Sequence, residues 1–230
     1  VNGYLVRDVS SKDILMNYGV DGRKIEVGYD IGLNSKFYDD PDFSINEQFH
    51  IKSDKPILCI SLVKENIGLH VKNFAINVIN KLTDYGFEIL LLAMDEREEE
   101  ELGLFYEIKK QIKNPSDVHI VVPNNPAQVS AAIKKSNAVV AFRLHCAVMA
   151  VSMGKPTFVL AREAKQNWLS EFVGQNRWWK FSEKSKPNEE EVFSRIVEDV
   201  CCKNFTGQEN KNTHLLIKAE NQFTSYMEKI

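Results

Sequence analysis

The sequence predicts an α/β protein with a doubly wound, mostly parallel, Rossmann-like sheet. Two observations lead to this prediction. Continuous apolar runs with β-branched residues, as at 56–63 and 87–94, are typical of strands that are buried on both faces. Helical patterns separate these runs, and strands that alternate with helices indicate parallel pairing through right-handed crossovers.

The N-terminal 55 residues contain a shorter version of the same alternation. The pattern predicts a strand at 4–6, a helix at 10–18 and a strand at 24–27, followed by a polar and aromatic linker over 33–55. We therefore divide the chain into an N-terminal segment, 1–55, with a partial β–α–β unit and a linker, and a Rossmann-like domain, 56–230, which C-terminal helices close.

In the larger domain, boundary residues place the next elements. Apolar residues recur at helical spacing over 71–82, and Gly86 follows where a helix C-cap favours glycine. The acidic stretch 95–101 suits the positive end of a helix dipole, and Pro115 ends that helix. We expect the acidic run 98–101 to be a solvated helix start. The remaining pattern predicts strands at 118–122, 138–142 and 157–160, and helices at 126–135, 144–153, 189–204 and 211–229.

Composition and charge narrow the class of function. The 230 residues are long enough for a substantial core, and 29 basic residues against 32 acidic ones give a net charge of −3, which argues against a nucleic-acid partner. No apolar run approaches the roughly 18 residues that cross a bilayer. The four cysteines form no Cys-x-x-Cys pair, so we expect no metal site. We expect a cytoplasmic protein, free or at the inner face of the membrane.

An arginine and a histidine stand where a predicted strand gives way to a helix, in Arg143-Leu144-His145. Open α/β sheets bind ligands at the carboxyl ends of their strands, and helix N-termini favour anions. Arginine offers a planar fork for phosphate or carboxylate, and histidine exchanges protons near neutral pH. The residues alone predict an anion site here, although a lone histidine after an apolar strand is more often a satisfied buried group.

Other features leave alternatives open. Arg7 and Asp8 stand at a strand end, either as part of a binding site or as a simple ion pair. The sequence has no Walker loop and no Gly-x-Gly-x-x-Gly, which argues against a nicotinamide dehydrogenase. A nucleotide-sugar glycosyltransferase needs neither motif and stays an alternative.

The segment around Arg143-Leu144-His145 resembles the Arg-Leu-His signature of polysaccharide pyruvyl transferases. The resemblance continues with Lys165 and the following helix, and with Arg7-Asp8 and Ser10 near the N-terminus, where Asp30 falls near a further family element. It covers roughly residues 4–175. It implies an architecture similar to one lobe of a GT-B-type fold.

The resemblance also implies an activity: transfer of the enolpyruvyl moiety of phosphoenolpyruvate to a sugar of a surface polysaccharide, or of its precursor, as a ketal. Arg7, Arg143, Leu144 and Lys165 would bind substrate, and His145 would be the general acid. Phosphoenolpyruvate would be a donor substrate without a further cofactor or metal, and the acceptor would be a saccharide, free or lipid-linked, with peripheral membrane association in the second case. The alternatives are a GT-B-like glycosyltransferase and a non-catalytic anion- or sugar-binding lobe.

Overall fold

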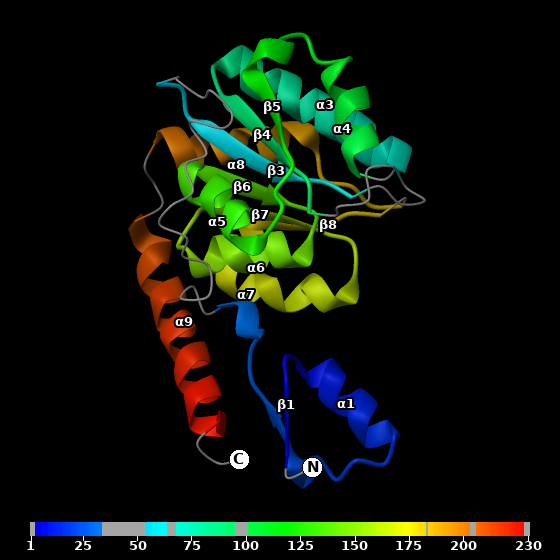
Figure 1. Ribbon diagram of the computed structural model, residues 1–230, viewed down its shortest axis with the longest axis vertical. Coiled ribbons are helices and arrows are strands. Elements are labelled where there is room, and N and C mark those ends of the chain that lie inside the picture. The colour runs from blue at the N-terminus through cyan, green and yellow to red at the C-terminus, as the bar shows by residue number, and fades with distance from the viewer. Residues whose placement is uncertain are drawn as a thin grey trace.

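A six-stranded parallel sheet forms the centre of the molecule (Figure 1). The protein's structure is a computed structural model that describes residues 3–33, 54–63, 68–94, 101–182, 184–202 and 206–227. The sheet order is β5-β4-β3-β6-β7-β8, with every neighbouring pair parallel. Its strands are β3 (Ile57–Ser61), β4 (Glu88–Leu92), β5 (Val118–Val121), β6 (Ala138–Ala141), β7 (Thr157–Ala161) and β8 (Trp178–Lys180).

Helices cover both faces of this sheet, because the strand residues alternate between two hydrophobic cores. One core joins Leu58 and Val140 to the helices α3 (Gly68–Tyr85), α4 (Glu101–Lys109) and α8 (Glu189–Cys201). The other joins Cys59 and Val139 to α5 (Pro126–Lys135), α6 (Leu144–Ser152) and α7 (Ser170–Val173). The predicted doubly wound α/β class is therefore confirmed.

The N-terminal unit lies apart from the sheet domain and beside the last helix (Figure 1). Its strands β1 (Tyr4–Val6) and β2 (Ile25–Val27) pair in parallel, and the helix α1 (Val9–Asn17) connects them. The segment that follows β2 returns to the domain, where the Tyr29 ring packs edge-on against Phe172 of α7 at 5.5 Å between centroids.

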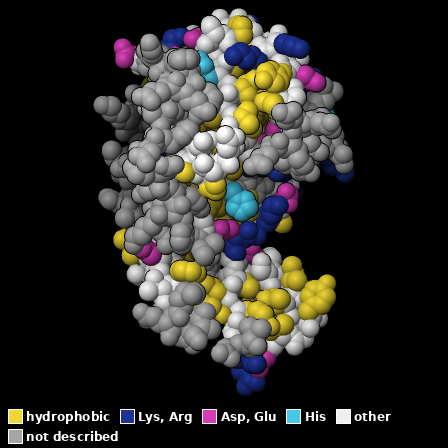
Figure 2. Space-filling model, in the orientation of Figure 1, with side chains coloured by type: hydrophobic (Ala, Val, Ile, Leu, Met, Phe, Trp, Pro, Cys, Tyr) yellow, Lys and Arg dark blue, Asp and Glu magenta, His cyan; other side chains and the backbone are white. Residues whose placement is uncertain are grey.

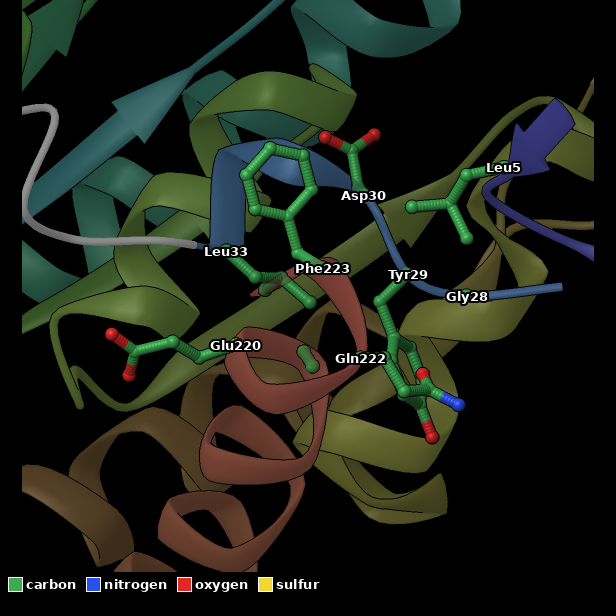
Figure 3. Close-up of a pocket in the computed structure, with 9 residues that line it drawn as sticks. Leu5, Gly28, Tyr29, Asp30, Leu33, Glu220, Gln222 and Phe223 are labelled. Atoms are coloured by element: carbon green, nitrogen blue, oxygen red, sulfur yellow. The ribbon is translucent and has the colours of Figure 1, made fainter. Parts of the chain in front are cut away.

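The long helix α9 (Thr206–Met227) runs from the sheet domain to this N-terminal unit (Figure 1). Figure 3 shows Leu5, Tyr29, and Gln222 and Phe223 of α9 around this junction. The cavity between them measures only about 20 Å³, room for about one water molecule. The junction is therefore a packing contact that fixes where β1 and the residue after it lie.

Residues that favour helix ends predicted several helix boundaries correctly. Gly86 adopts φ +108° directly after α3, a backbone conformation that L side chains rarely adopt, as the predicted C-cap requires. The helix predicted at 126–135 has those bounds, with the Asn125 side chain accepting from the Gln128 N–H. The last helix begins at Thr206 and not at 211. Residues 34–53 of the linker predicted over 33–55, and residues 95–100 of the helix start predicted over 95–101, lie outside the described residues.

Candidate anion-binding site

The strand order reverses between β3 and β6, which start connections to opposite sides of the sheet. Such a switch point leaves a crevice at the carboxyl ends of the two strands, where open α/β sheets bind ligands. Val63 stands just beyond β3, and Arg143 stands just beyond β6 as the residue that precedes α6. The predicted Arg143 site thus lies at the point that the fold favours for a ligand.

A cavity of about 230 Å³ opens at this switch point. Of the residues that the structure describes, four with cationic side chains line it, Arg7, Arg143, Arg162 and Lys165, together with one carboxylate, Glu163. Figure 2 shows a histidine with lysine and arginine side chains gathered beside it, next to the notch between the sheet domain and the N-terminal unit. The remaining lining residues are Val63, Met94, Phe142, Leu144, His145 and Gln166.

Arg7 reaches the cavity from the N-terminal unit, 136 positions before Arg143 in the chain (143 − 7). Its Nε donates to Asp8 at 3.1 Å, and its Nη1 donates to Asp30 at 3.3 Å. The ion pair that the sequence left as an alternative is therefore present, and the same arginine also lines the cavity.

Asp8 is also the N-cap of α1, and its carboxyl is held in the charged form. Burial pushes the pKa of its carboxyl upward, but hydrogen bonds from the Ser11 N–H and hydroxyl and from Arg7 outweigh burial and lower the pKa. The carboxylate therefore holds both the start of α1 and the Arg7 guanidinium.

Arg143 is held by Glu101, which belongs to the acidic run 98–101 that the sequence predicted as a solvated helix start. Glu101 Oε1 accepts from Arg143 Nε at 2.6 Å and also contacts Nη2, while Glu101 Oε2 accepts from the Met94 N–H at 2.7 Å. The expectation of a solvated helix start is wrong at this residue, because the Glu101 side chain is 0% exposed. Its burial is stabilised by the ion pair, which joins α4 to the end of β6 and which local sequence patterns do not reveal.

The segment after β7 supplies further cations to the cavity. Lys165, a predicted site residue, is half-exposed and pairs with Glu163 at 2.9 Å. Arg162, which was not among the predicted site residues, lines the cavity as well. The position of Arg162 in the sequence could have identified it, because it directly follows strand β7, much as Arg143 closely follows strand β6.

A buried glutamine joins these two strand ends. Gln166 Nε2 donates to the carbonyl of Phe142 at 3.0 Å, and Gln166 Oε1 accepts from the Arg162 and Glu163 N–H groups at 2.8 and 3.1 Å. One side chain thus fixes the backbone next to Arg143 and next to Arg162, so the spacing of the two arginines is built into the fold.

His145 and Leu144 occupy the first turn of α6 but differ in exposure. The Leu144 side chain is buried in the core, so what it presents to a ligand is mainly its backbone. The His145 side chain is exposed and lines both the cationic cavity and an adjoining cavity of about 370 Å³. Met94 also lines both cavities, and the second is otherwise formed by Ala93, Val122, Pro123, Asn124, Asn125, Pro126, Val129 and Met149.

Among the described residues, no group of three or more histidine, cysteine, aspartate or glutamate side chains is arranged to hold a metal ion. Within the same residues, no helix combines the length and the apolar character that a membrane span requires.

Solved structures show the same fold at low sequence identity. The chain is similar to S. aureus MnaA in a co-structure with UDP (TM-score 0.65, 17% identity, 100% of this chain and 62% of that one). It is also similar to UDP-GlcNAc 2-epimerase from Neisseria meningitidis bound to UDP-GlcNAc (0.63, 14%, 96% and 59%). A third similar structure is a glycosyltransferase from Rickettsia africae (0.61, 15%, 98% and 62%). The chain thus spans about three fifths of the length of each.

Sequence comparison supplies the family. No curated protein matches the chain. The family model described as polysaccharide pyruvyl transferase matches residues 2–163, which include Arg7, Glu101, Arg143, His145 and Arg162. The resemblance stated from the motifs is therefore confirmed, and the chain belongs to the polysaccharide pyruvyl transferase family.

Proposed function

We propose that this chain carries the donor site of a phosphoenolpyruvate-dependent transferase that places a pyruvate ketal on a saccharide. The observation behind the proposal is the cavity at the switch point, where four cations surround the exposed His145. Phosphoenolpyruvate has a phosphate and a carboxylate on neighbouring atoms, so it needs several fixed donors close together. Arginines held by carboxylates supply such donors with little reorganisation when the anion binds.

In the proposed reaction His145 gives a proton to C3 of phosphoenolpyruvate, and the methylene becomes a methyl group. A saccharide hydroxyl bonds to C2, and the C2–O bond to phosphate breaks. A second hydroxyl then bonds to C2 and closes the ketal. Of the two hydroxyl protons, one restores the protonated imidazole and the other leaves with inorganic phosphate. The cations of Arg7, Arg143, Arg162 and Lys165 would stabilise the departing phosphate and the carboxylate, so we propose that no separate cofactor takes part.

The adjoining cavity is our proposed site for the acceptor. Among the described residues that line it, charge arises only when His145 is protonated, and most are apolar, with the amides of Asn124 and Asn125 among them. Such a lining suits a neutral saccharide better than an anion. Because His145 and Met94 line both cavities, an acceptor hydroxyl there would lie near C2 of the donor.

The test is a thermal-shift and calorimetric titration of the chain with phosphoenolpyruvate, with UDP and ADP for comparison, on wild type and Arg143→Ala. We expect stabilisation by phosphoenolpyruvate that is lost in the variant. Stabilisation by UDP alone would instead support the second candidate, a GT-B-type glycosyltransferase, which the likeness to structures solved with UDP or UDP-GlcNAc favours.

Catalysis needs its own measurement because binding does not show turnover. Release of inorganic phosphate from phosphoenolpyruvate is followed with p-nitrophenyl hexosides as acceptors, on wild type and His145→Ala. We expect His145→Ala to bind phosphoenolpyruvate and to release no phosphate above background. Near-normal turnover by this variant would refute the role of His145 as general acid.

A further inference from the structure

Glu101 is a buried carboxylate that contacts Arg143 and that the proposed chemistry does not use. It is the first residue of α4, its side chain is 0% exposed, and it does not line the cationic cavity. Its two oxygens nevertheless contact two residues that do line the cavity. Oε1 accepts from Arg143 Nε at 2.6 Å, and Oε2 accepts from the Met94 N–H at 2.7 Å.

The two partners of the ion pair differ in what they face. Arg143 keeps 30% of its side-chain surface exposed at the cavity, whereas Glu101 keeps none. Glu101 contacts the Nε and Nη2 atoms on one edge of the guanidinium, so the Nη1 end is directed away from it. A buried carboxylate that contacts one edge of an arginine restricts the plane and direction of the whole planar group.

We propose that Glu101 is a positioning residue for anion binding, which orients the Arg143 guanidinium toward the cavity and ties the end of β4 to it through Met94. The identity of the anion as phosphoenolpyruvate rests on the proposed function, but the orientation of Arg143 does not. An unrestrained arginine loses considerable side-chain freedom when a ligand immobilises it, and Glu101 imposes that loss during folding, before any ligand arrives.

Positioning and simple electrostatics predict opposite results when Glu101 loses its charge. If the cavity only attracts anions by its net charge, Glu101→Gln makes the site more positive and tightens binding of an anion. If Glu101 positions Arg143, the same substitution weakens binding by roughly three- to tenfold, the range that corresponds to immobilising one flexible side chain. The sign of the change therefore separates the two explanations.

The experiment measures the Kd of phosphoenolpyruvate and of inorganic phosphate by calorimetry on wild type, Glu101→Gln and the matched control Glu163→Gln. Glu163 is a half-exposed carboxylate that lines the same cavity and pairs with Lys165. We expect weaker binding in Glu101→Gln and tighter binding in Glu163→Gln, because the second substitution removes negative charge from the cavity without touching Arg143. Unchanged or tighter binding in Glu101→Gln would overturn the proposal.

A double-mutant cycle tests whether Glu101 acts through Arg143. In an Arg143→Ala background we expect Glu101→Gln to have no further effect on anion affinity, because the guanidinium that Glu101 orients is no longer there. An equal loss of affinity in both backgrounds would overturn the proposal. If Glu101→Gln fails to fold, Arg143→Lys replaces it, since lysine keeps the charge but lacks the planar edge, and wild-type affinity in Arg143→Lys would equally refute positioning.

The two anions separate this proposal from the proposed function. If wild type binds phosphate but not phosphoenolpyruvate, the donor assignment fails while the role of Glu101 is still decided by the phosphate affinities. A wild-type chain that binds neither anion would overturn both.

Discussion

Replacing Arg7 by methionine tests whether the N-terminal unit contributes to the anion site. Arg7 lines the cationic cavity, and its guanidinium contacts Asp8 at 3.1 Å and Asp30 at 3.3 Å. Methionine keeps much of the length of the side chain and removes its charge and all its donors. The substitution therefore separates the two interpretations that the sequence left open, a binding residue and a simple ion pair.

The expected loss of stability is small. The Arg7 side chain is 28% exposed, and partly exposed ion pairs contribute up to about 1 kcal/mol. Both carboxylates keep other donors, since Asp8 accepts from the Ser11 N–H at 2.8 Å and Asp30 accepts from the Gly32 N–H at 3.0 Å. A loss of about 1 kcal/mol lowers the Tm of a chain of this length by roughly 2–4 °C.

The expected loss of affinity is larger than the loss of stability. One hydrogen bond between charged groups contributes about 1.5–3 kcal/mol, so we expect the Kd of phosphoenolpyruvate to rise roughly 10- to 150-fold. The matched control is Arg23→Met in the same unit, since Arg23 pairs with Asp21 at 2.7 Å, is 91% exposed and does not line the cavity. We expect wild-type affinity in the control. Wild-type affinity in Arg7→Met as well would show that Arg7 serves only its two aspartates.

Two further predictions concern the fold and its pH dependence. Asp199→Ala should lower the free energy of unfolding by about 3–5 kcal/mol in urea titrations, because it leaves the 2%-exposed Arg177 without the carboxylate that its Nε contacts at 2.5 Å. A loss below about 1 kcal/mol would contradict this reasoning, whereas Arg177→Met with Asp199→Leu should recover most of the stability. Burial lowers the pKa of His119 although Glu88 acts in the opposite direction, so the unfolded chain binds this proton first and stability falls as the pH drops through about 6.5. Urea midpoints between pH 5.5 and 7.5 should therefore vary less in His119→Gln than in wild type, and a larger variation would show that Glu88 dominates.

Local patterns in the sequence determined the elements and their faces. A continuous apolar run such as 87–94 is stable only when both of its faces are covered, so it indicates an interior strand without any knowledge of the fold. Gly86 marked the end of α3 because its backbone conformation is unfavourable for other residues. The place of Arg143 followed as well, since a residue directly after a buried parallel strand stands at the ligand-binding edge of the sheet.

The tertiary structure alone decided which charged groups meet. Arg7, Glu101 and Arg143 are far apart in the sequence, and they come together because the strand order puts the ends of β4 and β6 on either side of β3, while α9 and Tyr29 hold the N-terminal unit beside them. The acidic run at 98–101 resembled a solvated helix start because local composition carries no information about a cation 42 positions away. Periodicity records which side of an element is buried, whereas the partner of a buried charge depends on the packing of distant elements.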